Sequence, residues 1–197
     1  VNLKARTPLG ANVTVFWAGL EGKEALGQPF LLANAGKDKS REYRLLKVDG
    51  KKGQFLYDLS YGQQRHYADS VEATVPNATY RDIQLGYDFG PVVVKVQREA
   101  LENGFQTPLA TLHAFNGWAD RFLTTPAGGL VDTNIKASGK VAGLGLALAV
   151  HRFKANDSSK QFGQEIDASV SKTFTPNWSA MVKVAQYDGS GEITTGT

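Results

Sequence analysis

The three histidines are the first residues of this 197-residue chain to consider for chemistry. His66, His113 and His151 lie far apart in the sequence, and the chain contains no cysteine. A zinc site needs several imidazole, thiolate or carboxylate ligands held together, so we expect no metal site. No phosphate-binding loop or dinucleotide fingerprint stands between a strand and a helix, so we also expect no cofactor.

A hydrolytic site would need a nucleophile held against a base. Ser169 with His151 is the one pair that can be named, and no motif connects the two residues. We therefore expect that the protein is not an enzyme, and a membrane-embedded hydrolase is the least favoured alternative.

Charged residues offer a different chemistry, because many of them alternate with apolar residues. In "YRDIQLGYDFG" (residues 80–90), Asp82 and Asp88 share one face of an expected strand, and Ile83 and Leu85 share the other. A face of this kind can contact a hydrophilic solute. The candidates for solute contact are Lys4, Arg6, Arg44, Lys95, Lys136, His151, Lys183, Asp82, Asp88, Glu165 and Asp167.

Two arrangements of these charges are possible. The basic residues could form a row that attracts anions, as charged rings do in selective pores. Alternatively, they could pair with acidic residues on neighbouring strands and leave a neutral wall. The sequence leaves both arrangements open.

The elements that would hold these residues are ten segments with strand character. Most alternate with a period of two and are separated by turns rich in Gly, Pro, Asn and Asp. The segments are residues 1–9, 13–20, 41–48, 54–64, 80–90, 92–99, 132–140, 144–155, 165–174 and 178–187. The pattern predicts an all-β antiparallel fold in a single domain, residues 1–197.

Alternation alone does not say which face meets water. In a transmembrane barrel the apolar face meets lipid, whereas in a soluble barrel or sandwich it points inward. The row from Leu144 to Val150 carries no charge, and Phe89, Phe174 and Trp178 lie at strand ends, as in the aromatic girdles of membrane barrels. These features favour a transmembrane β-barrel. The net charge is +3 without a run of like charges, so we expect no nucleic-acid partner.

One connection is unusually long. "GFQTPLATLHAFNGWADRFLTTPAGGLVDT" (residues 104–133) contains an expected loop over 104–131, and connections of this length are uncommon in compact domains. Its apolar residues recur at three and four over 109–122, which predicts a short helix there. The loop could narrow a pore or only stiffen the barrel. Its candidate contact residues are Phe115, Asn116, Trp118, Asp120 and Arg121.

This segment resembles the alginate-export family of outer-membrane porins. The resemblance rests on "TPLATLHAFNGWAD" followed by "FL", "TPA" and "GL", and it continues through "VHRFKAN", "GQEIDASVSKTF" and "WSAMVKVAQYDG". It covers Thr79–Gly189 well and the first part of the chain more loosely.

The resemblance implies a β-barrel of about 18 strands, within the range of outer-membrane barrels, embedded in the bacterial outer membrane. It also implies a porin that moves a hydrophilic solute, such as an anionic polyuronate, by facilitated diffusion or export. Outer-membrane lipid and the solute would be its partners, and we expect a monomer. Ten strands are too few for such a barrel, and "GSGEITTGT" ends the chain without a further strand. We therefore expect a C-terminal portion of a longer protein.

The alternative is a soluble or surface β-barrel or sandwich that binds carbohydrate. Trp17, Trp118 and Trp178 would be its stacking residues.

Overall fold

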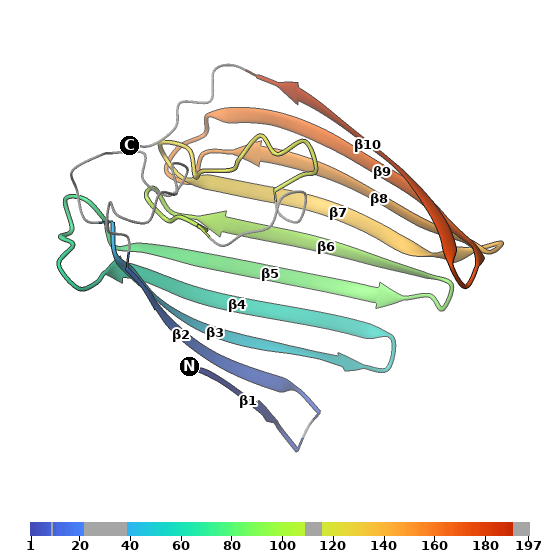
Figure 1. The fold of residues 1–197 in the computed structure, drawn as a ribbon, viewed down its shortest axis with the longest axis horizontal. Helices are drawn as coiled ribbons and strands as arrows, with labels where there is room; N and C mark the ends of the chain where they lie inside the picture. The colour runs from blue at the N-terminus through green and yellow to red at the C-terminus, as the bar shows by residue number, and fades with distance from the viewer. Residues whose placement is uncertain (9, 22–38, 109–115, 191–197) are drawn as a thin grey trace.

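The computed structural model describes residues 1–8, 10–21, 39–108 and 116–190, and these residues build one sheet (Figure 1). Its ten strands are β1 (Asn2–Arg6), β2 (Asn12–Leu20), β3 (Arg41–Lys52), β4 (Phe55–His66), β5 (Ala78–Asp88), β6 (Val92–Leu101), β7 (Leu130–Val141), β8 (Leu144–Lys154), β9 (Gln161–Thr175) and β10 (Trp178–Gly189). Each strand pairs antiparallel with the next in the chain. The predicted all-β antiparallel fold of ten strands is confirmed. None of the described residues belongs to a helix long and apolar enough to cross a membrane.

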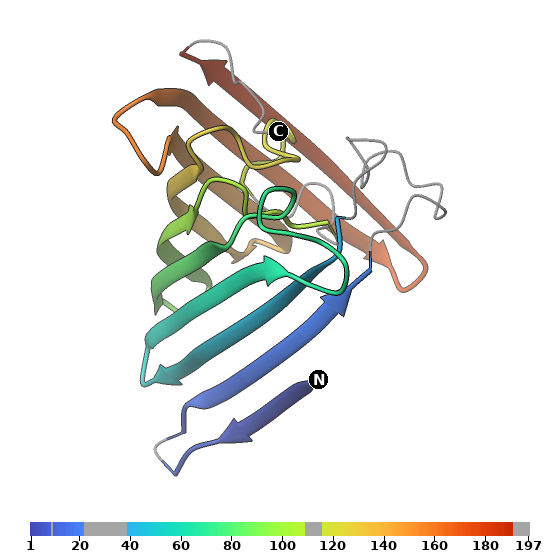
Figure 2. The same ribbon diagram turned by 90° about the vertical axis from the view of Figure 1, so that its left-hand side faces the viewer.

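The sheet is strongly curved and open. Within the described residues, β1 pairs only with β2, and β10 pairs only with β9. The described parts of the connection between β6 and β7, residues 102–108 and 116–129, lie within the concave side of the sheet (Figure 2). We call the concave side the inner face and the convex side the outer face.

The connections differ between the two ends of the sheet. At one end, the turn end, the five links are short and include the two-residue corner Ala142-Gly143. Both of its residues have positive φ, 51° and 77°, as in the tight hairpin turns that match the twist of paired strands. At the other end, the loop end, three of the four links are long and span 21–40, 67–77 and 102–129. The β6–β7 loop thus begins and ends two residues earlier than predicted.

The short helix expected over 109–122 is not present in its described part. Residues 116–122 form turns and bends, and residues 109–115 lie outside the described part of the chain. Phe122, one of the apolar residues whose spacing predicted the helix, packs into the core below the loop without being helical.

Register places apolar side chains in rows across the outer face. Leu85, Val96, Ile135, Val150 and Ile166 are cross-strand neighbours from β5 to β9. Each of these side chains is between 46% and 57% exposed. The outer face therefore presents a continuous apolar surface that nothing in the described chain covers.

The buried core lies on the opposite side, between the inner face and the β6–β7 loop. Phe122 from the loop packs against Phe153 of β8 at 4.5 Å between ring centroids and against Phe162 of β9 at 6.0 Å. Phe105, at the start of the loop, packs against Tyr43 and Tyr80. The core fixes the loop to the loop end of the inner face.

Candidate functional site

The inner face collects all but one of the predicted solute-contact residues that belong to strands. Residues of one strand that are two apart share a face, and the cross-strand pairing then assigns the faces of all ten strands. The inner face carries Lys4, Arg6, Asp82, Asp88, Lys95, Lys136, His151, Glu165, Asp167 and Lys183.

Arg44 lies on the outer face instead. It is the cross-strand neighbour of Trp17 and forms an ion pair with Glu42 at 2.8 Å. Glu42 also accepts a hydrogen bond from the indole nitrogen of Trp17 at 3.0 Å. Arg44 is thus part of a surface cluster and not of the inner wall.

Three carboxylates form a row across the inner face. Asp82, Glu99 and Asp132 are direct cross-strand neighbours on β5, β6 and β7, and each is at most 4% exposed. Like charges directly opposite one another destabilise a sheet, so this row depends on hydrogen-bond donors around it. The hydroxyl of Tyr80 supplies one such donor, to Glu99 Oε1 at 2.9 Å.

A row of amide side chains lies one step closer to the turn end and supplies most of the other donors. Gln84 and Gln97 both donate to Asp82, at 2.7 and 2.8 Å. Asn134 donates to Asp132 at 3.0 Å. Buried polar networks of this kind are stable only when their members find partners.

His151 lies in the same row as these amides, between two carboxylates. Its Nδ1 is 2.8 Å from Asp132 Oδ2, and its Nε2 is 3.6 Å from Asp167 Oδ2. The imidazole is 2% exposed and stacks on Phe153 at 5.5 Å. For His151 to act as a catalytic base, a nucleophile would have to lie next to a ring nitrogen. Both ring nitrogens face carboxylates instead.

The β6–β7 loop binds the two acidic residues of β9 through its backbone. Ala119 N donates to Glu165 Oε1 at 2.8 Å, and Trp118 N donates to Asp167 Oδ2 at 3.2 Å. Gly117 has φ +89°, and a Cβ there would lie 2.5 Å from Glu165 Oε2. Only glycine fits this close approach of backbone to carboxylate.

Loop side chains add contacts on both sides of this anchor. The Lys183 ammonium lies 4.2 Å from the centroid of a Trp118 ring, and the Arg121 guanidinium lies 5.3 Å from the Tyr187 ring centroid. Asn116 is buried, and Asp120 has φ 53°. Phe115, the fifth loop candidate, lies outside the described residues.

Gln64 of β4 anchors the start of the loop. Its amide nitrogen donates to the carbonyls of Pro76 at 3.1 Å and Gly104 at 2.9 Å, and its oxygen accepts from Gln106 N at 2.9 Å. The side chain is 1% exposed. One amide thus joins two loops to the inner face.

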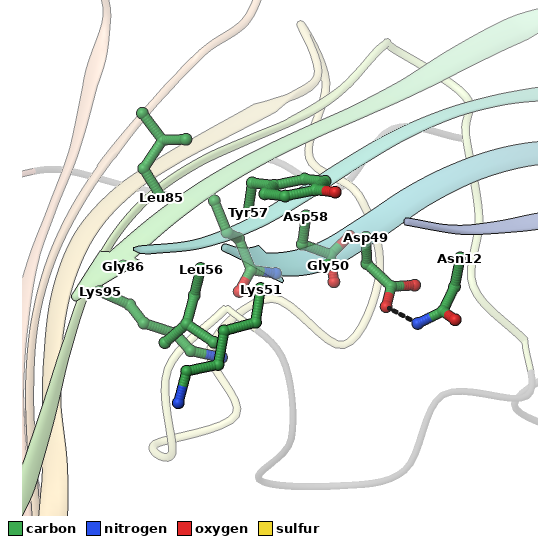
Figure 3. Close-up of a pocket in the computed structure, with 11 residues that line it drawn as sticks. Asn12, Asp49, Gly50, Lys51, Leu56, Tyr57, Asp58, Leu85, Gly86 and Lys95 are labelled. Carbon is green, nitrogen blue, oxygen red and sulfur yellow. Dashed lines mark hydrogen bonds between the residues drawn. The ribbon is translucent and has the colours of Figure 1, made fainter. Parts of the chain in front are cut away.

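The turn end of the inner face is more open and more basic. Lys47 pairs with Asp58, and Lys51 pairs with Asp88 at 2.6 Å. A hollow of about 310 Å³ lies beside these pairs. In Figure 3 the side chains of Lys51, Leu56 and Lys95 point to the same side of the sheet.

Lys95, Lys136 and Lys183 make no ion pair with a carboxylate in the described part of the chain. Lys136 donates to Gln97 Oε1 at 3.0 Å, and Lys183 lies over Trp118. Lys95 and Lys136 are cross-strand neighbours. The lysines that form ion pairs, Lys47 and Lys51 of β3, are therefore not among the predicted contact residues.

Sequence reasoning missed several charged residues of the inner wall, among them Glu99 and Asp132. Both lie at every-second-residue positions from a predicted contact residue, Lys95 and Lys136 respectively. Extending the alternation to the strand ends would have found them. No described set of three His, Asp or Glu side chains is placed to hold a metal ion.

No family model, curated protein or solved structure matches the chain.

Proposed function

We propose that the protein is an outer-membrane β-barrel porin in which this sheet forms part of the wall. The observation that carries the proposal is the opposite polarity of the two faces. The inner face is polar, charged and partly covered by a loop, and the outer face of the described chain is mostly apolar, with its central rows exposed. In a membrane barrel these faces line an aqueous lumen and contact lipid.

The height of the apolar face supports this proposal. On β9 the outward residues from Ile166 to Phe174, which are apolar except for Lys172, span eight residue steps, about 27 Å along a strand at about 3.4 Å per residue. For strands tilted by about 40° this is about 21 Å along the membrane normal, close to the apolar band of roughly 25 Å in outer-membrane barrels.

Closure of the barrel would require partners for β1 and β10. Unpaired backbone groups of a sheet edge cost several kcal/mol each in hydrocarbon. In the proposed protein these edges pair with further strands of the same wall.

The solute in this proposal is hydrophilic, and the lysines favour an anion. Lys95, Lys136 and Lys183 face the inner side without an ion pair to a carboxylate in the described chain, and Lys183 lies over Trp118 of the β6–β7 loop. An acidic polysaccharide such as a polyuronate fits this chemistry.

The carbohydrate-binding alternative has less support. Trp17 and Trp178 are on the outer face of strands near opposite edges of the sheet, whereas Trp118 belongs to the inner loop. The three indoles therefore share no stacking platform.

Single-channel recording of the protein in a planar bilayer, with and without polyuronate, tests the proposal. We expect discrete conductance steps that polyuronate blocks. Conductance steps that polyuronate does not change would support the porin but contradict an acidic polysaccharide as its solute. A protein that gives no steps and stays monodisperse without detergent would contradict the proposal.

A further inference from the structure

We propose that the outer face carries a binding site for the phosphate of an anionic lipid headgroup, formed by Arg98, Arg152 and Lys154 at the loop end of the apolar surface. The inference rests on the proposed membrane location, and it adds a specific lipid partner on one side of the bilayer.

Strand register brings these three cations together on the outer face. Arg98 of β6 and Arg152 of β8 are each two residues beyond an exposed apolar residue, Val96 and Val150. Both are cross-strand neighbours of Thr133 on β7. With strands 4.7–4.9 Å apart, the two arginine backbones are roughly 10 Å from each other.

Lys154 extends the group by one step toward the loop end. It is the outward residue after Arg152 on β8 and the cross-strand neighbour of Val131. Val131 and its neighbour Ala100 are only 1% and 7% exposed. Both residues are buried, so a lipid would contact the three cations and the exposed apolar rows that begin at Val96 and Val150.

The charges of this group are not neutralised within the described chain. Neither arginine nor Lys154 forms an ion pair with a described carboxylate. The nearest outward acids are Glu102, which pairs with Arg81 at 3.4 Å, and Asp188, which is two strands from Arg152 across Gln164. Because Arg81 is already paired with Glu102, it is not part of the proposed site.

The position of the group matches the headgroup level of a bilayer. It borders the apolar rows at the loop end, whereas exposed aromatic residues border them at the turn end, including Phe89 at 60% and Trp178 at 74% exposure. Arginine binds phosphate oxygens through two parallel hydrogen bonds, and basic residues next to a membrane attract anionic lipids. Charge complementarity thus selects a phosphate-bearing lipid whose acyl chains lie along the apolar rows.

The test is a lipid titration of the detergent-solubilised protein, followed by native mass spectrometry. The probes are phosphatidylglycerol, phosphatidylcholine and inorganic phosphate. Arg98→Gln/Arg152→Gln is compared with Lys52→Gln/Lys172→Gln, which removes two charges from the outer face at the turn end. Arg98→Lys/Arg152→Lys, which keeps the charge, checks that the fold tolerates substitution at both positions.

We expect the wild-type protein to prefer phosphatidylglycerol over phosphatidylcholine. The Arg98→Gln/Arg152→Gln variant should lose roughly 25-fold in affinity for phosphatidylglycerol, because each cation near an anionic surface contributes roughly five-fold. The turn-end variant should change less than roughly two-fold, and the lysine variant should keep most of the binding.

Three results would overturn the site: equal affinity for the two lipids, equal losses in both glutamine variants, or displacement of the lipid by inorganic phosphate at similar concentration, which would indicate a free-anion site. These results are distinct from failure of the porin proposal. A porin without the site still inserts into phosphatidylcholine vesicles, whereas a protein that is not a membrane barrel stays soluble and binds neither lipid.

Discussion

On the inner face of β5 to β9, each buried charged side chain has at least one polar partner within the chain, whereas most apolar side chains on the outer face of the same strands are exposed. Asp82 receives hydrogen bonds from two glutamines, and Glu165 and Asp167 receive them from the loop backbone. On the outer face, Ile135 and Ile166 are more than half exposed.

The proposed membrane location would give each face a solvent that suits it. A contiguous exposed apolar surface of this extent is rare on soluble monomers, and it would be stable in lipid. The inner face would be costly in lipid, because charged groups there would need even more partners than they have. In the proposed porin both faces are satisfied, because the sheet would separate lipid from water.

The substitution with the largest expected effect places a charge in the centre of the outer face. We expect Leu148→Arg, in the middle of the outward apolar row of β8, to reduce the free energy of unfolding in lipid vesicles by about 2–4 kcal/mol, the cost of a basic residue on the lipid face at the bilayer midplane. Phe89→Arg, near the turn end, is the control and should cost about 0–1 kcal/mol. Urea titration of vesicle-embedded protein measures both.

A soluble protein would behave differently under the same substitution. Exposed substitutions in water usually change stability by no more than about 0.5 kcal/mol. Equal effects of the two variants within that range would show that the outer face does not meet lipid.

The second substitution disrupts the contact between the inner face and the β6–β7 loop. Gly117→Ala should destabilise the loop by about 1–3 kcal/mol, because the new Cβ combines a positive φ with a clash against Glu165. Gly143→Ala is the matched control: it also has a positive φ, 77°, but no atom lies within 4 Å of the added Cβ. Hydrogen exchange at the amides of Trp118 and Ala119 reports the opening of the loop.

We expect exchange at these two amides to rise in Gly117→Ala and to stay unchanged in Gly143→Ala. If both variants left it unchanged, the contact between the loop and β9 would not hold the loop in place. A loop that opens should also widen the passage, so Gly117→Ala should increase single-channel conductance.

The ten strands could be predicted because most of them are buried on one face only. Where both faces are buried, the alternation disappears and the prediction stopped early. Ala100 and Leu101 are both buried at the end of β6, and Leu130 and Val131 are both buried at the start of β7. The predicted strands over 92–99 and 132–140 therefore missed two residues at each of these ends.

The faces of the site residues followed from the same alternation, and Arg44 shows where it fails. In "REYRLLKV" the adjacent Leu45 and Leu46 point to opposite faces, so no apolar row indicates which face Arg44 shares. The loop anchor could not be predicted either. Trp118 and Asp167 are 49 residues apart, and their contact depends on how the loop lies on the finished sheet.

The smallest expected effect concerns the charge balance of the inner face itself. Lys95 and Lys136 are cross-strand neighbours without carboxylate partners in the described chain, whereas Lys47 and Lys51 on β3 are paired with Asp58 and Asp88. Lysines already neutralised contribute little to the field in a lumen. We therefore expect Lys95→Gln/Lys136→Gln to shift the ratio of anion to cation permeability toward cations by roughly two- to five-fold, since charges facing water interact through a high dielectric.

Lys52→Gln/Lys172→Gln is the control, because it removes the same charge from the outer face. Reversal potentials across a salt gradient measure the permeability ratio, and the shift should fall as salt rises above about 0.1 M, where the Debye length is about 10 Å. Equal shifts in the two variants would show that total charge, and not its placement on the inner face, sets selectivity. A shift confined to Lys95→Gln/Lys136→Gln would place the ion path along β6 and β7, on the side of the sheet that the loop covers.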